Sequence, residues 1–360
     1  MNLIQNTVFP QLITQWYEIN KRFLPWRQTR DPYSIWVSEI ILQQTRIEQG
    51  MEYYLNFIAA FPDVQSLAAV SEEAVLSVWK GLGYYSRARN MHHTARRVVQ
   101  NFNGIFPATY NDLIGLKGIG PYTAAAIASI CNNEAIPVVD GNVIRVFSRI
   151  FGFMDVVGSS TGYRKVFEKS AGYIKYSEPG TYNQAVMEFG ALQCKPRQPL
   201  CDQCLFQKSC YALMHNLVEQ LPQPAKSILK KERFFHYFLI THPEKGILMQ
   251  KRGAGDIWQN LWELPLVESG KLRPIEEVIE SSGLEGEGNL IRQFSFTDHK
   301  HILTHQLIRA RIFVLPKAKL RSDPLPPLTW QKDPLKNKLP LPRLIDKYLK
   351  RVQDESERIK

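Results

Sequence analysis

The sequence has no long hydrophobic run. No apolar stretch among its 360 residues approaches the roughly 20 residues that a membrane-spanning helix needs, which argues against a membrane protein. The first residues also lack the basic leader of a signal peptide, and their apolar side chains recur at helical spacing (Ile4, Val8, Leu12, Trp16 and Ile19). We therefore expect a cytoplasmic protein that makes no membrane contact.

The amino-acid composition further limits the class of protein. Apolar residues make up 44% of the chain and charged residues 22%, so wholesale disorder is not expected. A length of 360 residues suits two domains, each with its own core. The net charge of +11 suits a polyanionic partner such as nucleic acid, although charge alone does not establish one.

Hydrophobic periodicity divides the chain into two parts. Residues 1–216 show helical periodicity broken by short turn signals, which predicts an all-α domain. Residues 217–232 carry prolines and little periodicity, as an interdomain linker does. Residues 233–350 predict an α+β domain, and residues 351–360 a tail.

The α+β prediction depends on four segments. Residues 234–252 read as a β-hairpin, F-F-H-Y-F-L-I followed by T-H-P-E-K-G and I-L-M-Q-K-R. Residues 274–282 read as a short helix. Residues 301–315 alternate, so that Ile308, Ala310, Ile312 and Val314 would share one face. A final basic helix is expected near residues 341–352.

Four of the five cysteines form one group with the spacing C-x6-C-x2-C-x5-C: Cys194, Cys201, Cys204 and Cys210. Disulfides are disfavoured, because nothing else indicates an oxidising compartment. Four thiolates suit a tetrahedral zinc ion, although zinc sites usually use two closely spaced pairs and only one pair is close here. Four staggered thiolates on one loop also suit a cubane iron–sulfur cluster, which needs one ligand per iron.

A glycine-rich turn lies at Lys117-Gly118-Ile119-Gly120, between two helical segments. The two glycines allow a sharp turn and a close approach of another backbone. The amide groups that begin the next helix would then offer an anion site. A plain connector between helices is the alternative.

Two carboxylates stand in unusual settings. Glu39 interrupts the apolar run S-I-W-V-S-E-I-I-L, and on a helix it would share a face with Ile35 and Leu42. Apolar surroundings would raise its carboxyl pKa by desolvation. Asp140 precedes Gly141-Asn142 and an apolar segment, a pattern that also suits a plain helix N-cap. For Glu39 the alternative is a solvated or salt-bridged helix residue.

These motifs resemble known enzymes. The cysteine spacing is similar to the [4Fe–4S] loop of the endonuclease III superfamily of DNA glycosylases, and the glycine turn is similar to its phosphate-binding helix-hairpin-helix. Several blocks resemble the adenine DNA glycosylase (MutY) family in particular: Leu24–Arg27, Asp31–Tyr33, Trp36–Glu39, Gln43–Thr45 and Gly81–Asn90.

The resemblance implies a fold and a cofactor. It implies a helix-hairpin-helix glycosylase domain, with a six-helix barrel over about 28–135 and an iron–sulfur subdomain over about 1–27 and 136–216. The four cysteines would then hold a [4Fe–4S] cluster. It also implies a Nudix-like second domain that recognises 8-oxoguanine. Since no Nudix box G-x5-E-x7-R-E-x2-E-E is found, hydrolysis of nucleoside diphosphates by that domain is not expected.

The implied activity is a monofunctional adenine DNA glycosylase of base excision repair. Its substrate would be duplex DNA with adenine opposite 8-oxoguanine or guanine, acted on by a monomer after the adenine is flipped out. Such chemistry needs two carboxylates in different environments. The resemblance makes Glu39 the acid and Asp140 the anion, with Tyr122 and Asn142 orienting groups around them.

Two rival activities are weighed against this one. A bifunctional glycosylase/lyase would carry a lysine in the hairpin, but Tyr122 occupies that position and no lysine lies between Lys117 and Lys165. A non-catalytic iron–sulfur DNA-binding protein would not need both Glu39 and Asp140.

The resemblance also assigns DNA contacts. These are Trp26 and Arg27 for the adenine pocket, Gln43, Gln44 and Tyr84 for the opened base stack, Arg87, Arg89, Lys117, Gly118 and Gly120 for phosphates, and Thr304 and His305 for 8-oxoguanine. Helix surface and core packing remain the alternatives for Gln44 and Tyr84. The chain departs from the family pattern at Lys117, which is usually proline, and at Leu303, which is usually aromatic.

Overall fold

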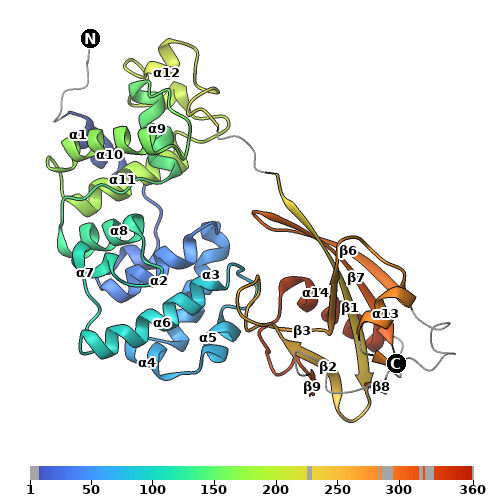
Figure 1. The fold of residues 1–360 in the computed structure, drawn as a ribbon. Coiled ribbons are helices and arrows are strands. Elements are labelled where there is room, and N and C mark those ends of the chain that lie inside the picture. Colours follow the sequence, from blue (N-terminus) through green and yellow to red (C-terminus); the bar gives the residue numbers. More distant parts are fainter. Residues whose placement is uncertain are drawn as a thin grey trace. The chain divides into compact units, whose positions relative to one another are not determined.

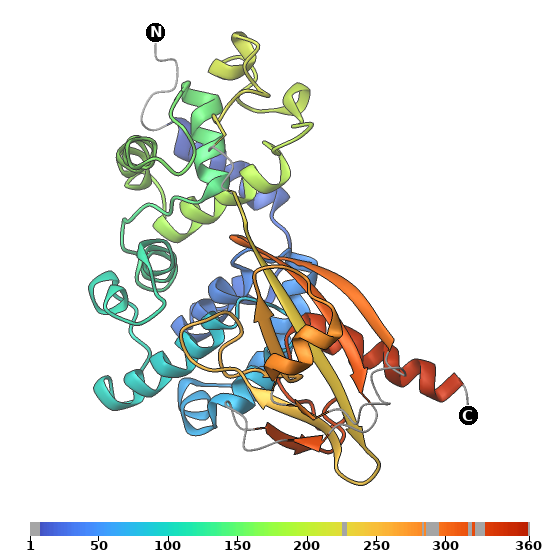
Figure 2. The same ribbon diagram turned by 45° about the vertical axis from the view of Figure 1, so that its right-hand side comes forward.

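The computed structural model of the chain describes residues 8–224, 229–282, 284–285, 295–315, 319–320 and 328–358. It divides into two compact units (Figures 1 and 2). Met1–Ala69 and Asn90–Lys226 form the first, and Val70–Arg89 with Ser227–Lys360 form the second. Residues 70–89, which the sequence places in the helical domain, therefore pack within the second unit. Among the described residues, no helix is both long enough and apolar enough to cross a membrane.

The first unit is helical, which confirms the all-α prediction. Its elements are α1 (Val8–Asn20), η1 (Pro25–Arg27), α2 (Pro32–Leu42), α3 (Ile47–Ala60), α4 (Val64–Ala69), α6 (Ser86–Asn101), α7 (Tyr110–Ile114), α8 (Pro121–Asn132), α9 (Gly141–Phe151), α10 (Ser160–Ile174), α11 (Pro179–Leu192), η2 (Cys201–Gln203) and α12 (Tyr211–Met214). Helix α6 begins in the segment that belongs to the second unit.

Helix α1 forms where the apolar spacing of the first residues predicts a helix. Phe9, Ile13 and Tyr17 are buried in an aromatic core with α9, α10 and α11. Ile19, by contrast, is 84% exposed, and Ile4 lies outside the described residues. Leu12 and Trp16, two of the residues noted for their helical spacing, are half-buried against the same core.

Helix α2 has clear local signals. Asp31 caps it by accepting hydrogen bonds from the backbone N–H and the hydroxyl of Ser34, and Pro32 occupies its first turn. The helix ends at Leu42, and two residues later Gln44 adopts a left-handed backbone with φ +56°. Glu39 therefore lies on the last full turn of a largely buried helix, with Gln43 and Gln44 on the loop that follows.

The glycine hairpin joins α7 to α8. Gly118 has φ +82°, and a Cβ added there would lie 2.7 Å from the Cβ of Asn90 on α6. The hydroxyl of Thr94 donates a hydrogen bond of 2.8 Å to the carbonyl oxygen of Lys117. The turn thus requires glycine for both its dihedral and its close packing on α6.

The described residues of the second unit form a seven-stranded sheet, a separate strand pair and the helices α5, α13 and α14. Its elements are α5 (Glu72–Val78), β1 (Lys231–His242), β2 (Gly246–Lys251), β3 (Trp262–Glu263), β4 (Leu266–Ser269), α13 (Ile275–Ser282), β5 (Leu284–Glu285), β6 (Ser295–Ile302), β7 (Gln306–Leu315), β8 (Lys319–Leu320), β9 (Leu328–Gln331) and α14 (Arg343–Arg358). The strand order is β3-β2-β1-β7-β6, with β4 also paired to β1 and β9 to β2, while β5 and β8 form a separate pair.

A parallel pair lies at the centre of the sheet. Strands β1 and β7 run parallel, whereas β6–β7, β1–β2 and β1–β4 are antiparallel. Alternate residues of β1 pack on opposite faces of the sheet: Phe235 and Tyr237 against α14, and Phe238 and Ile240 against α13. The α+β prediction is confirmed, including the β1–β2 hairpin.

Residues 301–315 are not one continuous strand. Strand β6 ends at Ile302, and β7 begins at Gln306. The turn between them is closed by a hydrogen bond of 2.9 Å from the N–H of Leu303 to the carbonyl oxygen of Gln306. From Ile308 onward the expected alternation holds, because Ile308 and Ile312 are fully buried. Helix α14 continues to Arg358, beyond its predicted end near 352.

Polar contacts explain why residues 70–89 belong to the second unit. Lys80 forms an ion pair of 2.7 Å with Asp346 of α14. Glu73 of α5 accepts hydrogen bonds from Lys251 at 2.8 Å and from the indole of Trp262 at 3.1 Å. These contacts tie α5 and the turn that follows it to the β-sheet.

Candidate active site

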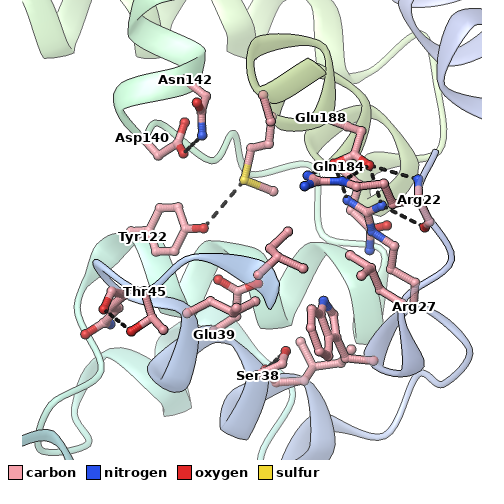
Figure 3. A pocket seen from close by; sticks show the side chains of 18 of the residues that line it. Arg22, Arg27, Ser38, Glu39, Thr45, Tyr122, Asp140, Asn142, Gln184 and Glu188 are labelled. Atoms are coloured by element: carbon pink, nitrogen blue, oxygen red, sulfur yellow. Dashed lines mark hydrogen bonds and ion pairs between the residues drawn. The ribbon is translucent and has the colours of Figure 1, made fainter. Parts of the chain in front are cut away.

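A cavity of about 890 Å³ opens in the first unit (Figure 3). Its walls come from η1, α2 and the loop after it, α8, α9 and α11. The structure brings together there the residues predicted for the catalytic and adenine-contacting groups: Trp26, Arg27, Glu39, Gln43, Gln44, Tyr122, Asp140 and Asn142. The volume is of the order found for small-molecule sites.

Glu39 projects from α2 into this cavity. Ile35 and Leu42, the neighbours expected on its helix face, also line the wall. Burial raises the pKa of Glu39 to about 7, a hydrogen bond with Tyr122 opposes the rise, and the nearby Asp140 adds to it. A carboxyl with this pKa is protonated in a large fraction of molecules near neutrality.

Asp140 is both a helix cap and a cavity residue. One carboxylate oxygen accepts a 2.8 Å hydrogen bond from the N–H of Val143 at the start of α9, and the other accepts a 2.7 Å bond from the side-chain amide of Asn142. Burial raises its pKa, while these bonds and the charge of Arg145 lower it. The capping alternative therefore does not compete with a role in the cavity, because one side chain serves both.

A chain of hydrogen bonds leads from Asp140 to the cysteine loop. The Oδ1 atom of Asn142 accepts a 2.9 Å bond from Arg145, and Arg145 donates a further 2.8 Å bond to the carbonyl oxygen of Cys194. Arg145 is buried. The orientation of Asn142, and through it of Asp140, thus depends on the backbone of that loop.

Tyr122 lies in the first turn of α8 and lines the cavity beside Glu39. Its hydroxyl hydrogen-bonds Glu39 and also donates to the sulfur of Met187 at 3.5 Å (Figure 3). Burial, with the two carboxyls nearby, raises the pKa of Tyr122 well above its usual value. None of the described residues that line the cavity is a lysine.

Sequence reasoning missed a charged cluster on the opposite wall (Figure 3). Glu188 of α11 is buried, and its carboxylate accepts bidentate hydrogen bonds from both Arg22 and Arg27. Burial opposes ionisation, but these bonds hold the pKa of Glu188 at about 2. Gln184, one turn earlier, also lines the cavity and accepts a hydrogen bond from Tyr17. Glu188 lies in the apolar run A-V-M-E-F-G, the same kind of signal that identified Glu39.

Two residues predicted for the base stack have strained backbones. Gln44 in the first unit has φ +56°, and Tyr84 in the second has φ +48°. Both side chains are exposed. Non-glycine residues rarely adopt this conformation, and such strain concentrates at functional sites.

The four clustered cysteines line one small cavity together with Arg149. Arg149 donates a hydrogen bond to the Cys194 sulfur at 3.5 Å, and the Cys210 thiol donates to the carbonyl oxygen of Arg149 at 3.3 Å. In the described part of the chain no three His, Cys, Asp or Glu side chains converge as ligands of a single metal ion. A cluster places one thiolate on each of four irons, so its sulfurs stand further apart than those around one ion.

A second cavity, of about 320 Å³, lies within the second unit. Its lining includes Tyr84, Arg89, Trp258 and the turn Leu303–His305. The hydroxyls of Tyr84 and Thr304 lie 2.6 Å apart and share a hydrogen bond. Tyr84, predicted for the opened base stack, and Thr304 and His305, predicted for 8-oxoguanine, therefore line one cavity.

The predicted phosphate contacts differ in their surroundings. Lys117, Gly118 and Gly120 are exposed on the hairpin. Arg87 instead folds over the rings of Trp79 and Tyr84, and burial lowers its pKa to about 10. Arg89 donates a 3.0 Å hydrogen bond to the carbonyl oxygen of Gln259.

Known proteins share both the fold and the sequence. Residues 37–170 match the family described as HhH-GPD superfamily base excision DNA repair protein, and residues 236–351 match the NUDIX domain. The adenine DNA glycosylase of Buchnera aphidicola subsp. Schizaphis graminum is 35% identical over 272 residues, which cover 75% of this chain and 77% of that protein. The chain belongs to the adenine DNA glycosylase family.

Other members and neighbours agree with this placement. The adenine DNA glycosylase of Homo sapiens is 40% identical over 224 residues, 60% of this chain and 41% of that protein. A thermostable thymine-DNA glycosylase superimposes with a TM-score of 0.54 at 26% identity, over 58% of this chain and 97% of that one. A trapped endonuclease III–DNA complex superimposes with a TM-score of 0.52 at 19% identity, over 60% of this chain and all of that one, and shows the shared fold.

Proposed function

We propose that this adenine DNA glycosylase hydrolyses the N-glycosidic bond of adenine mispaired with 8-oxoguanine or guanine. The observation that carries the proposal is that Glu39 and Asp140 line one cavity. The cavity can accommodate a purine, and an adenine stacked in a duplex must leave the helix to reach it.

The two carboxyls differ in a way that suits acid-assisted bond cleavage. Glu39, with a pKa of about 7, can hold a proton near neutral pH and donate it to a ring nitrogen of adenine. The electron pair of the glycosidic bond then leaves with the base, and the sugar becomes an oxocarbenium ion. Asp140, whose carboxylate is oriented by hydrogen bonds from the N–H of Val143 and the side-chain amide of Asn142, stabilises that cation until water adds to C1′.

The polar groups on the opposite wall suit recognition of the base. Arg22 and Arg27 are held in place by Glu188, and Gln184 by Tyr17, so their donors and acceptors are fixed before a base arrives. Trp26 supplies a flat apolar surface beside them. Hydrogen-bonding groups that are fixed in advance in this way can distinguish one base from another.

Two features favour a monofunctional hydrolase over a lyase. An imine route needs an amine nucleophile, and no described residue lining the cavity supplies one. Tyr122, in the corresponding position, is bonded to Glu39 and remains protonated because its pKa is raised. Water is then the nucleophile available to C1′.

The cysteine loop suits a [4Fe–4S] cluster held by Cys194, Cys201, Cys204 and Cys210. Their common cavity and the N–H···S contact from Arg149 fit thiolate ligands, whose negative charge that guanidinium would balance. The cluster would stabilise the conformation of the loop, and the backbone of this loop positions Arg145. Lys195 and Arg197 on the same loop are candidates for phosphate contact.

The purified protein should be brown and contain about four irons per chain. Replacing Cys204 by Ser should bleach the visible absorption, because it removes a ligand. Replacing Cys131, which lies outside the cluster cavity, should leave it unchanged. A colourless protein with one zinc per chain would overturn the cluster assignment.

The second cavity supports recognition of the base opposite adenine. Thr304 and Tyr84 hold hydroxyls that can hydrogen-bond the extra oxygen or the N–H by which 8-oxoguanine differs from guanine. Leu303 packs against the core of the second unit, so the turn presents Thr304 rather than an intercalating aromatic.

Replacing Glu39 by Gln should abolish adenine release while retaining affinity for the mispaired duplex, because the amide keeps the shape of the side chain but donates no proton. The measurement is single-turnover release of adenine, with binding followed separately. Unchanged turnover would refute the role of Glu39. Efficient covalent trapping of the wild-type enzyme by borohydride would instead indicate a lyase.

Replacing Thr304 by Val should reduce the preference for 8-oxoguanine over guanine by about tenfold, since one hydrogen bond is worth about 1.4 kcal/mol. The readout is the ratio of adenine-release rates on the two mispairs. The matched control is Thr297→Val on β6, outside the cavity lining, which should keep the wild-type ratio. An unchanged ratio in the Thr304 variant would show that this turn does not read the opposite base.

A further inference from the structure

A row of cations runs along one exposed side of α14. Arg343, Lys347 and Arg351 are spaced four residues apart, so their side chains follow one another on the same helix face. With a rise of 1.5 Å per residue, successive charges are about 6 Å apart along the axis. We call Arg343, Lys347 and Arg351 the α14 row. Arg343 and Lys347 form its near end, and Arg351 its far end.

Two histidines of β6 lie beside this row. His299 and His301 are two residues apart on a strand, so both side chains point to the face covered by α14. The ring of His299 packs edge-on against Tyr348 at 5.6 Å. Burial lowers the pKa of His301, and the charges of Arg343 and Lys347 lower it further. For His299 burial again acts first and Arg351 second, while Asp298 opposes them.

Within the described part of the chain, the charges of the row differ in their ion pairs. Lys350 is paired with Asp346 at 3.0 Å, and Arg351 with Glu355 at 2.9 Å. Within the described residues, no ion pair joins Arg343 or Lys347 to a carboxylate. Like charges so close together raise the free energy of the folded chain unless an anion approaches them.

The start of α14, which carries the near end of the row, packs in the same core cluster as Trp258 and Leu303 of the second cavity. The ring of His301 packs edge-on against Trp258 at 5.6 Å, and Trp258 lines that cavity together with Thr304 and His305. A nucleotide seated at Thr304 would therefore have the row next to its own strand. The positive charge of the α14 row, together with its continuity with this cavity, indicates a polyanionic ligand that extends beyond one base.

We propose that the α14 row binds the phosphates of the DNA strand that carries the base opposite adenine. This inference rests on the proposed function, because it extends the DNA contact from the Tyr84–Thr304 cavity along α14. The contact is to the backbone and does not depend on sequence, so it adds affinity for any duplex and fixes the position of the turn Leu303–His305 on the damaged one.

The test is the salt dependence of binding to an undamaged duplex, measured by fluorescence anisotropy between 50 and 200 mM salt. Replacing Arg343 and Lys347 together by Ala should lower the slope of log K against log salt by about 1.8, or 0.9 per lost phosphate contact. The ratio of wild-type to variant affinity should then shrink about tenfold across this range. A Lys347→Arg variant, which keeps the charge, should retain the wild-type slope.

The matched control removes the same charge elsewhere on the second unit. Lys245, in the turn between β1 and β2, and Lys271, after β4, are both exposed. Their double replacement by Ala should leave the slope unchanged. An unaltered slope in the Arg343/Lys347 variant, or an equal fall in the control, would overturn the proposal. Binding to undamaged DNA needs no catalysis, so a failure of adenine release by the wild-type enzyme is a separate result.

Discussion

The structure depends on one costly arrangement, a carboxyl group held in an apolar wall. Ionised Glu39 would be poorly solvated there, and this burial raises the pKa of its carboxyl to about 7. The same burial that disfavours the charge stores a proton next to the cavity. The hydrogen bond with Tyr122 limits the shift, so that the proton can still be given up. The chemistry we propose follows from this balance between burial and hydrogen bonding.

The other groups of the site are fixed by contacts that exist without substrate. Asp140 caps α9. Hydrogen bonds through Asn142 and Arg145 connect it to the backbone of the cysteine loop, which fixes its orientation. Glu188 holds two guanidiniums against one wall. Breaking such a buried ion pair by removing one partner costs about 3–5 kcal/mol, so these residues stabilise the fold as well as the site. Preorganisation of this kind makes the cavity ready for a base before one enters.

Much of the site could be predicted from the sequence, because its signals are local. An acidic residue in an apolar run drew attention to Glu39, whereas the local pattern at Asp140 suited a plain helix cap and only the family resemblance assigned Asp140 to the site. The same signal was present at Glu188 and went unused, since nothing in the sequence says that two arginines over 160 positions away would pair with it. The packing of residues 70–89 with the second unit depends on distant ion pairs such as Lys80–Asp346, which no local pattern encodes.

The proposed cleavage of the glycosidic bond depends most on the proton held by Glu39. Its carboxyl can be titrated directly by ¹³C NMR in the free protein labelled at glutamate, with the Glu39→Gln variant identifying the resonance. We expect a midpoint near pH 7, set by burial and by the neighbouring Asp140. In the Asp140→Asn variant the midpoint should fall, because the nearby negative charge is gone. A midpoint of about 4.5 in the wild-type protein, the ordinary value for a glutamate, would contradict the role of Glu39 as the proton donor.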